Sequence, residues 1–243
     1  MIRDRLPIYL DIETIPGQQD FVKEELLAEA EETKSALKAP ANYKDPEAIE
    51  KYLSTKFKEI DADVDDRWRK TSFDGGLGQI ACISVAFGDD APINIYEEDW
   101  KHKEADVLAR FYTEVNAAVK KELGRRPVFV GHNVANFDLR FLYQRSIMLG
   151  VKPPSVMPYN VKPWDDAIFD TMTAWAGFNK TVKLDKLCRI FGIAQKGAEI
   201  GEEIDGSQVW DYVQRGEIAK VALYCGGDVE RCRGVYKRLN FLD

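Results

Sequence analysis

Alternating apolar and polar residues predict a strand near the start of the chain. Residues 8–14 read Ile-Tyr-Leu-Asp-Ile-Glu-Thr, so Leu10 and Ile12 point to one side and Asp11 and Glu13 point to the other. Two neighbouring carboxylates on a strand that otherwise looks buried are costly unless a cation lies between them. The pattern leaves three interpretations open: a solvated strand edge, a carboxylate pair bound to arginine or lysine, and a metal site of oxygen ligands.

The next segment has the periodicity of two helices. Apolar residues recur at helical spacing over residues 22–37 and again over residues 49–60. Asp45 followed by Pro46 is typical of a helix start, because the carboxylate can cap free backbone N–H groups and proline suits the first helical position.

The net charge of −7 is unevenly distributed. Residues 17–66 contain 14 acidic and 7 basic residues, whereas the rest of the chain contains 27 of each. Residues 152–196 are mildly basic, with 7 basic and 4 acidic residues, and could follow a phosphate backbone or form a solvated face. We interpret residues 17–70 as a helical insertion after the first strand of a single domain that spans residues 1–243.

The rest of the chain predicts a hairpin and then strands that alternate with helices. The hairpin strands are expected at residues 79–87 and 92–96, joined by a turn at Gly88-Asp89-Asp90. Asn136 is expected to cap one of the helices, and the proline-rich residues 151–166 predict a long ordered loop. The order predicts an α/β domain with a mixed sheet flanked by helices. The other expected strands and helices lie at residues 103–123 (helix), 127–131 (strand), 137–149 (helix), 168–171 (strand), 184–191 (helix) and 217–239 (helix).

Two further polar positions are candidates for chemistry. Asp138 lies in the first turn of a predicted helix, at the carboxyl end of a strand, although the helix dipole alone favours acidic residues there. Tyr224 and Asp228 are four residues apart on one face of the last helix, with Gly226 and Gly227 between them. Each glycine costs a helix about 1 kcal/mol relative to alanine. Either another group approaches the backbone closely there, or the helix begins after the glycines.

Several classes of protein are disfavoured. No apolar run approaches the roughly 18 residues of a membrane span, and the polar start predicts no signal peptide. The four cysteines form no Cys-x-x-Cys pair, which argues against a zinc site or a disulfide framework and favours a reducing cytoplasm. His132 has no neighbouring cysteine or histidine, so we expect a structural, hydrogen-bonded histidine.

Taken together, these motifs resemble the DEDD-type 3'-5' exonucleases of the ribonuclease H-like superfamily. The first motif is Asp-Ile-Glu-Thr at residues 11–14, and the second is Asn133-x-x-x-Phe137-Asp138. The third, Tyr224-x-x-x-Asp228, is similar to that of the tyrosine subclass, because the histidine subclass carries histidine where this chain has Leu223. The spacing of the second motif resembles the proofreading domains of family-B DNA polymerases, and the whole chain looks like the stand-alone predicted exonucleases related to them.

The resemblance implies a ribonuclease H-like fold, a two-metal mechanism with Mg²⁺ or Mn²⁺, and roles for eight residues. Asp11 would bridge the two ions, Glu13 and Asp228 would complete one site, and Asp138 would act on the other largely through water. Tyr224 would hold the attacking water as a neutral phenol. The positions that match nucleotide-binding residues of the family are Thr14, Asn133 and Phe137, and for Phe137 a base contact and core packing are equally compatible with the sequence.

The expected substrate is the 3' end of single-stranded DNA, released as nucleoside 5'-monophosphates. An exoribonuclease of the same fold remains open, because the contacts that read the 2'-hydroxyl cannot be located from sequence. A non-catalytic nucleic-acid-binding module also remains open, although all four carboxylates and the tyrosine are present.

Overall fold

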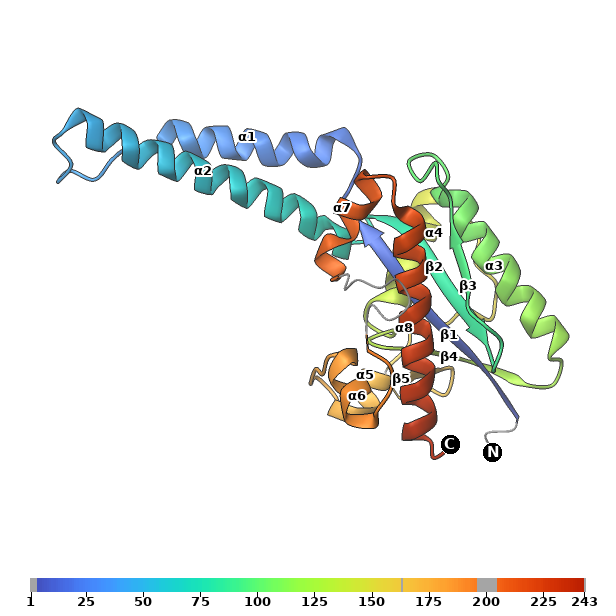
Figure 1. The fold of residues 1–243 in the computed structure, drawn as a ribbon. Coiled ribbons are helices and arrows are strands. Elements are labelled where there is room, and N and C mark those ends of the chain that lie inside the picture. Colours follow the sequence, from blue (N-terminus) through green and yellow to red (C-terminus); the bar gives the residue numbers. More distant parts are fainter. Residues whose placement is uncertain (1–3, 163, 196–204, 243) are drawn as a thin grey trace. The chain divides into compact units, whose positions relative to one another are not determined.

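The computed structural model of the chain describes residues 4–162, 164–195 and 205–242 (Figure 1). Pro163 of the predicted loop and Lys196 of the basic segment lie outside the described residues. The chain divides into two compact units, one made of residues 1–14 and 80–243 and the other of residues 15–79.

A five-stranded mixed sheet forms the first unit's framework. Its strands are β1 (Arg5–Ile15), β2 (Gln79–Phe87), β3 (Ile93–Tyr96), β4 (Arg126–Gly131) and β5 (Ile168–Asp170). They lie in the order β3-β2-β1-β4-β5. β1, β4 and β5 are parallel, with Ile8 opposite Phe129, whereas β2 and β3 form the predicted antiparallel hairpin. The predicted mixed α/β sheet is confirmed.

Helices lie on both faces of this sheet. Those described are α3 (Glu104–Lys121), α4 (Asp138–Leu149), α5 (Thr171–Ala176), α6 (Leu184–Phe191), α7 (Val209–Gln214) and α8 (Ile218–Leu239), with a short 3-10 helix, η2 (Gly206–Gln208). No helix in the described part of the chain is long and apolar enough to cross a membrane.

β1 presents alternate residues to two different sets of helices. Leu10 shares a buried core with Phe111 of α3 and Phe141 of α4. Tyr9 packs on the other face against Tyr236 of α8, with the two ring centroids 5.6 Å apart. In Figure 1, α8 runs across the sheet, and it contacts β3 and β4. Because side chains alternate along a strand, the odd-numbered carboxylates of β1 share the face that α8 covers.

The two glycines of α8 lie within the helix, so a helix start after them is wrong. A Cβ built on Gly226 would lie 2.5 Å from Oδ1 of Asn94 on β3. That oxygen accepts a hydrogen bond from the Ser84 hydroxyl on β2 at 2.8 Å. The close approach expected from the glycines is therefore confirmed at Gly226, where a polar pair from the hairpin occupies the space of a side chain.

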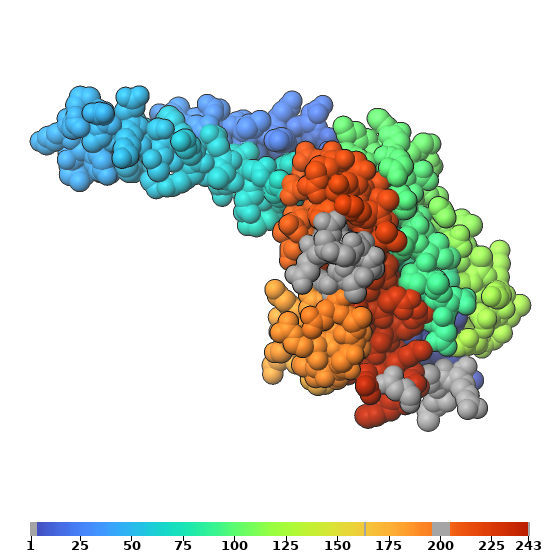
Figure 2. Space-filling view, in the orientation of Figure 1, coloured from blue at the N-terminus to red at the C-terminus, as the bar shows by residue number. Residues whose placement is uncertain are grey.

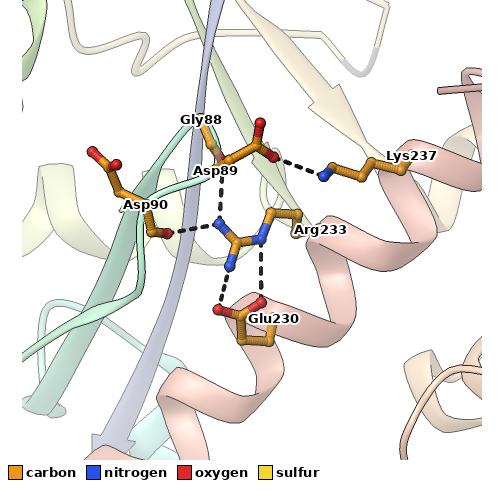
Figure 3. A network of polar contacts seen from close by, with 6 residues as sticks. All are labelled: Gly88, Asp89, Asp90, Glu230, Arg233 and Lys237. Carbon is orange, nitrogen blue, oxygen red and sulfur yellow. Dashed lines mark hydrogen bonds and ion pairs between the residues drawn. The ribbon is translucent and has the colours of Figure 1, made fainter. Parts of the chain in front are cut away.

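Two basic side chains fix the second half of α8 to the turn between β2 and β3 (Figure 3). The Arg233 guanidinium donates hydrogen bonds to the carbonyl oxygens of Gly88 at 3.2 Å and Asp90 at 2.7 Å. Lys237 forms an ion pair with Asp89 at 2.7 Å. Because turn carbonyls are rarely paired by secondary structure, these bonds hold α8 at a defined position on the sheet.

The second unit is a pair of helices, α1 (Asp20–Ala36) and α2 (Pro46–Lys70), followed by the 3-10 helix η1 (Thr71–Phe73). As predicted, the Asp45 side chain caps α2 by accepting the N–H of Ala48 at 3.3 Å. The buried Trp68 indole donates to the Gly17 carbonyl at 2.9 Å, which ties the two ends of the unit together. The unit is slightly longer than the predicted insertion at 17–70, and its place within one exonuclease domain stays a prediction.

The start of α4 differs from the prediction. Asn136 does not cap it: the helix begins at Asp138, and Phe137 precedes it without a side-chain cap. The Asn136 amide instead donates to the Asn133 side chain at 3.2 Å, inside the turn that precedes the helix. Helices α5 and α7 were not predicted, because six residues span fewer than two helical turns and leave no readable periodicity.

Candidate active site

Three carboxylates from β1 and α8 meet on the α8 face of the sheet. One ligand oxygen from each of Asp11, Glu13 and Asp228 lies within 4.8 Å of the others. Asp11 and Glu13 are half-buried, and Asp228 is buried. Residues more than two hundred positions apart thus lie together, and they are three of the four carboxylates in the sequence motifs. Carboxylate oxygens are the ligands that hard cations prefer.

A buried arginine also contacts this cluster. The Arg231 Nε donates to Oδ1 of Asp228 at 2.8 Å, and only 4% of its side chain is exposed. One oxygen of Asp228 is therefore hydrogen-bonded to the positively charged guanidinium of Arg231, which offsets part of the cluster's negative charge. Arg231 was not predicted from the sequence, although its spacing of three residues from Asp228 on one helix is a signal for such a pair.

The thiol of Cys225 orients Asp11. Its Sγ donates to the backbone carbonyl of Asp11 at 3.2 Å and lies 3.3 Å from the Asp11 carboxylate Oδ2. Burial raises the pKa of this thiol well above its ordinary value, so it remains a neutral donor. α8 therefore holds β1 at the position of the catalytic candidate as well as supplying Asp228.

Tyr224 is almost completely buried beside the three carboxylates. Burial raises the pKa of its phenol far above the ordinary value, and the charges of Glu13, Asp228 and Asp11 raise it further. Buried and uncharged, the phenol can donate a hydrogen bond to a neighbouring acceptor.

Asp138 lies next to the cluster without belonging to the group of three. Its Oδ1 accepts the backbone N–H of Ile12, between the two β1 carboxylates, at 3.2 Å. Burial raises the pKa of Asp138 to about 7, with further increases from Asp170 and Asp228, although backbone hydrogen bonds act in the opposite direction. A cation near this carboxylate would favour its charged form.

The link between β4 and α4 leads to Asp138, and it is held by a residue that was not predicted from the sequence. The buried Asp170, at the end of β5, accepts the backbone N–H groups of Asn133 at 3.1 Å and Ala135 at 3.2 Å. It also caps α5 by accepting the N–H groups of Met172 and Thr173. A single carboxylate thus fixes the second motif relative to β5.

The shape of this link depends on unusual backbone. Asn133 has φ of 67°, in the left-handed region that asparagine tolerates better than most residues. A Cβ at Gly131 would lie 2.6 Å from the Cβ of Val134, so only glycine fits there. The tight turn aims the start of α4 at β1, which is how Asp138 reaches Ile12.

His132 is hydrogen-bonded on both ring nitrogens, in agreement with the structural role expected for it. Its Nδ1 lies 2.9 Å from the Thr171 hydroxyl, and its Nε2 lies 2.8 Å from the carbonyl oxygen of Val182. Because a carbonyl can only accept, Nε2 carries a proton and donates it. The histidine therefore connects the loop after α5 to the link that begins at Asn133.

The three predicted nucleotide-binding positions are half-buried. Thr14 is near the end of β1, and Asn133 begins the link described above. Phe137 packs against the core and against the ring of Phe141, with centroids 5.7 Å apart. Core packing accounts for part of the Phe137 side chain, and contact with a nucleotide stays a prediction.

Comparison with known proteins agrees with this geometry. The family model described as "Predicted 3'-5' exonuclease related to the exonuclease domain of PolB" matches residues 76–243, which include Asp138, Tyr224 and Asp228 but not β1. Among solved structures, the family B DNA polymerase from the hyperthermophilic archaeon Pyrobaculum calidifontis is similar, with a TM-score of 0.56 and 16% sequence identity. The match covers 97% of this chain and 24% of the polymerase, so the chain spans about a quarter of that protein.

At this identity, the likeness to the polymerase shows the shared ribonuclease H-like fold alone. The family match covers more than half of the chain and contains two of the three motifs. The chain therefore belongs to the family of predicted 3'-5' exonucleases related to the exonuclease domain of PolB.

Proposed function

We propose that this protein is a metal-dependent 3'-5' exonuclease of the tyrosine subclass of DEDD enzymes. It removes nucleoside 5'-monophosphates from the 3' end of single-stranded DNA, within one exonuclease domain that carries residues 15–79 as an insertion. The observation that carries the proposal is the group of three carboxylates within 4.8 Å, next to a buried tyrosine. The family match supports the same reaction.

The residues fit divalent Mg²⁺ or Mn²⁺. Asp11, Glu13 and Asp228 offer only carboxylate oxygens, the ligands that these hard cations prefer. Asp11, Glu13 and Asp228 would hold the metal ions together with Asp138, whose carboxylate lies at the backbone of Ile12. Bound divalent metal would supply a lowered pKa for the attacking water and charge stabilisation for the attacking and leaving oxygens.

The chain's own groups would position the reactants. The protonated Tyr224 phenol would hold the attacking water in line by a hydrogen bond, which its buried and uncharged state permits. Thr14, Asn133 and Phe137 would hold the terminal nucleotide. Orientation of bound reactants contributes to catalysis because it replaces an entropic cost that would otherwise belong to the barrier.

Digestion of matched strands tests the proposal. A 5'-labelled single-stranded DNA and the RNA of the same sequence are incubated with Mg²⁺, Mn²⁺ or a chelator. We expect a metal-dependent ladder that shortens from the 3' end, faster for DNA. Faster cleavage of RNA would favour the exoribonuclease, and an intact strand under every condition would favour the non-catalytic binding module.

Replacement of Tyr224 by phenylalanine separates orientation from metal binding. The variant keeps the ring but loses the hydroxyl that would hold water, so kcat is expected to fall about 100-fold with KM little changed. The matched control is Tyr236→Phe, a buried tyrosine on the same helix that packs against Tyr9. Equal rates for native protein and Tyr224→Phe would contradict the role of the hydroxyl.

Replacement of Arg231 by methionine tests the metal-binding role of the cluster without measuring activity. Loss of the guanidinium leaves buried Asp228 without its ion pair, so the variant is expected to lose about 3 kcal/mol of stability in chelator. Mn²⁺ should recover most of this loss, because the bound ion would neutralise the carboxylates and bind only the folded state.

The measurement is thermal unfolding with chelator and with Mn²⁺. Each loss is taken relative to the native protein under the same condition, because Mn²⁺ stabilises every protein whose cluster is intact. The matched control is Arg233→Met on the same helix, whose loss concerns the turn contacts of Figure 3 and should be the same with Mn²⁺ as with chelator. An equally reduced loss in both variants, or an unchanged loss in Arg231→Met, would count against a metal at the cluster.

A further inference from the structure

Two large aromatic side chains are exposed in the loops on either side of β5 and α5. Trp164, before β5, is 62% exposed, and Phe178, after α5, is 58% exposed. Their rings meet edge to face, with centroids 5.2 Å apart. Leaving both rings in water forgoes the free energy that burial would gain, so a paired, exposed arrangement indicates a surface that binds something flat and apolar.

Three lysines lie in the same two loops as these rings. The Lys162 Nζ lies 6.0 Å from the centroid of the Trp164 ring. Lys180 and Lys183, in the loop that carries Phe178, are exposed, and within the described residues neither has an ion-pair partner. Lys103 and Lys237, by contrast, form ion pairs with Asp106 and Asp89.

Among the described residues, the two acidic neighbours of Trp164 form other contacts and no ion pair with these lysines. The Asp165 carboxylate accepts the backbone N–H of Lys162 at 2.8 Å, and Asp166 forms an ion pair with Arg5 at 3.3 Å. The surface is therefore aromatic and cationic, which is the combination that binds bases together with phosphates.

This surface is connected to the candidate active site through the loop that carries Phe178. The Val182 carbonyl, next to Lys183, accepts the hydrogen bond from His132, the residue before Asn133. Phe178 is four residues from Val182, so the chain allows a separation of at most about 14 Å. The segment from α5 to α6 includes both residues, and it is seen on the surface of the molecule in Figure 2 (orange).

We infer that Trp164 and Phe178, with Lys162, Lys180 and Lys183, form a stacking platform for single-stranded nucleic acid upstream of the terminal nucleotide. Unpaired bases would stack on the rings, and the lysines would contact the phosphates. A duplex cannot use the platform, because its bases already stack on each other. The inference rests on the proposed function, and it assigns to the same enzyme a source of preference for single strands.

Binding of a fluorescein-labelled (dT)12 strand, followed by anisotropy with Mg²⁺, tests the rings. All proteins carry Asp11→Asn, so that the strand stays intact. Trp164→Ala is expected to weaken binding roughly tenfold, which is the typical loss for one stacked base. The control is Phe241→Ala, a 94% exposed aromatic at the end of the chain, which should bind as tightly as its parent. Equal affinities for the two alanine variants would overturn the platform.

The salt dependence of the same binding tests the lysines. The double variant Lys180→Ala/Lys183→Ala should reduce the slope of log K against log salt by about 1.4, because each phosphate contact to a single strand contributes about 0.7. Lys120→Ala, an exposed lysine of α3, is the control and should leave the slope unchanged. An unchanged slope in the double variant would contradict phosphate contacts at this surface.

The two experiments distinguish a failure of the platform from a failure of the proposed function. If the protein with native Asp11 degrades strands but Trp164→Ala binds (dT)12 like Phe241→Ala, the platform is wrong and the proposed function stands. If it degrades nothing yet Trp164→Ala weakens binding, the platform stands and the proposed function is wrong.

Discussion

Replacement of Asp11 by asparagine is expected to slow shortening of a single-stranded 3' end by about 1000-fold or more. Its carboxylate oxygen lies within 4.8 Å of ligand oxygens of Glu13 and Asp228, and asparagine keeps the shape of the side chain but not its charge. Metal ions stabilise charge in such transition states by several kcal/mol, and a loss of about 4 kcal/mol corresponds to about 1000-fold in rate. Initial rates on a 5'-labelled oligodeoxynucleotide with Mg²⁺ measure the effect.

Asp90→Asn is the matched control, since Asp90 is exposed on the turn between β2 and β3. It should cleave at the native rate. In chelator, Asp11→Asn should unfold at a temperature no lower than the native protein, because one of three clustered charges is removed. A variant that is folded and retains more than about a tenth of the native rate would contradict the assignment of Asp11.

Replacement of Arg145 by methionine is expected to lower the free energy of unfolding by about 3–5 kcal/mol, the usual cost of breaking a buried ion pair. Arg145 on α4 donates from Nε and Nη2 to the Glu104 carboxylate at 2.7 and 2.6 Å, and both side chains are almost fully buried. Glu104 also accepts the N–H of Ile80 at the start of β2. The variant would leave this carboxylate buried with only one hydrogen bond.

Urea unfolding measures this loss. Arg215→Met is the control, because its ion pair with Glu217 is exposed and should contribute less than about 1 kcal/mol. The double variant Glu104→Gln/Arg145→Met should recover part of the stability, since no buried charge then remains. Similar losses in Arg145→Met and Arg215→Met would contradict the role of the buried pair.

The part of the site that the sequence predicted depends on local periodicity. Alternation along β1 places Asp11 and Glu13 on one face, and helical spacing places Tyr224 and Asp228 on another, so each pair can be read from a few neighbouring residues. The meeting of the two pairs follows from the resemblance to a known family. The structure gives the physical reason for this meeting, because α8 covers the face of β1 that carries the odd-numbered residues.

The residues that hold these groups could not be read in the same way. Asp170 acts on Asn133 and Ala135 across more than thirty residues, and such a contact exists only after β4 and β5 have paired. Arg231 is closer, but an arginine one turn from an acidic residue is usually a solvent-exposed pair of little consequence. Its burial, which comes from tertiary packing, makes it part of the site.

Local rules also failed where tertiary contacts replaced them. Asn136 has the side chain of a helix cap, yet the turn that begins at Asn133 uses its amide, and α4 starts two residues later. At Gly226 the local rule succeeded, because a glycine that destabilises a helix indicated a close neighbour. That neighbour is the Asn94 side chain, which only the folded sheet brings to this position.

The polarity and product of digestion test the proposed reaction most directly. One single-stranded DNA is labelled at its 5' end and, in a second sample, at its 3' end, and both are incubated with the native protein and Mg²⁺. The proposed function predicts a ladder from the 5'-labelled strand and immediate release of the 3' label as a nucleoside 5'-monophosphate. Release of the 5' label first, internal cleavage, or an intact strand would contradict a 3'-5' exonuclease.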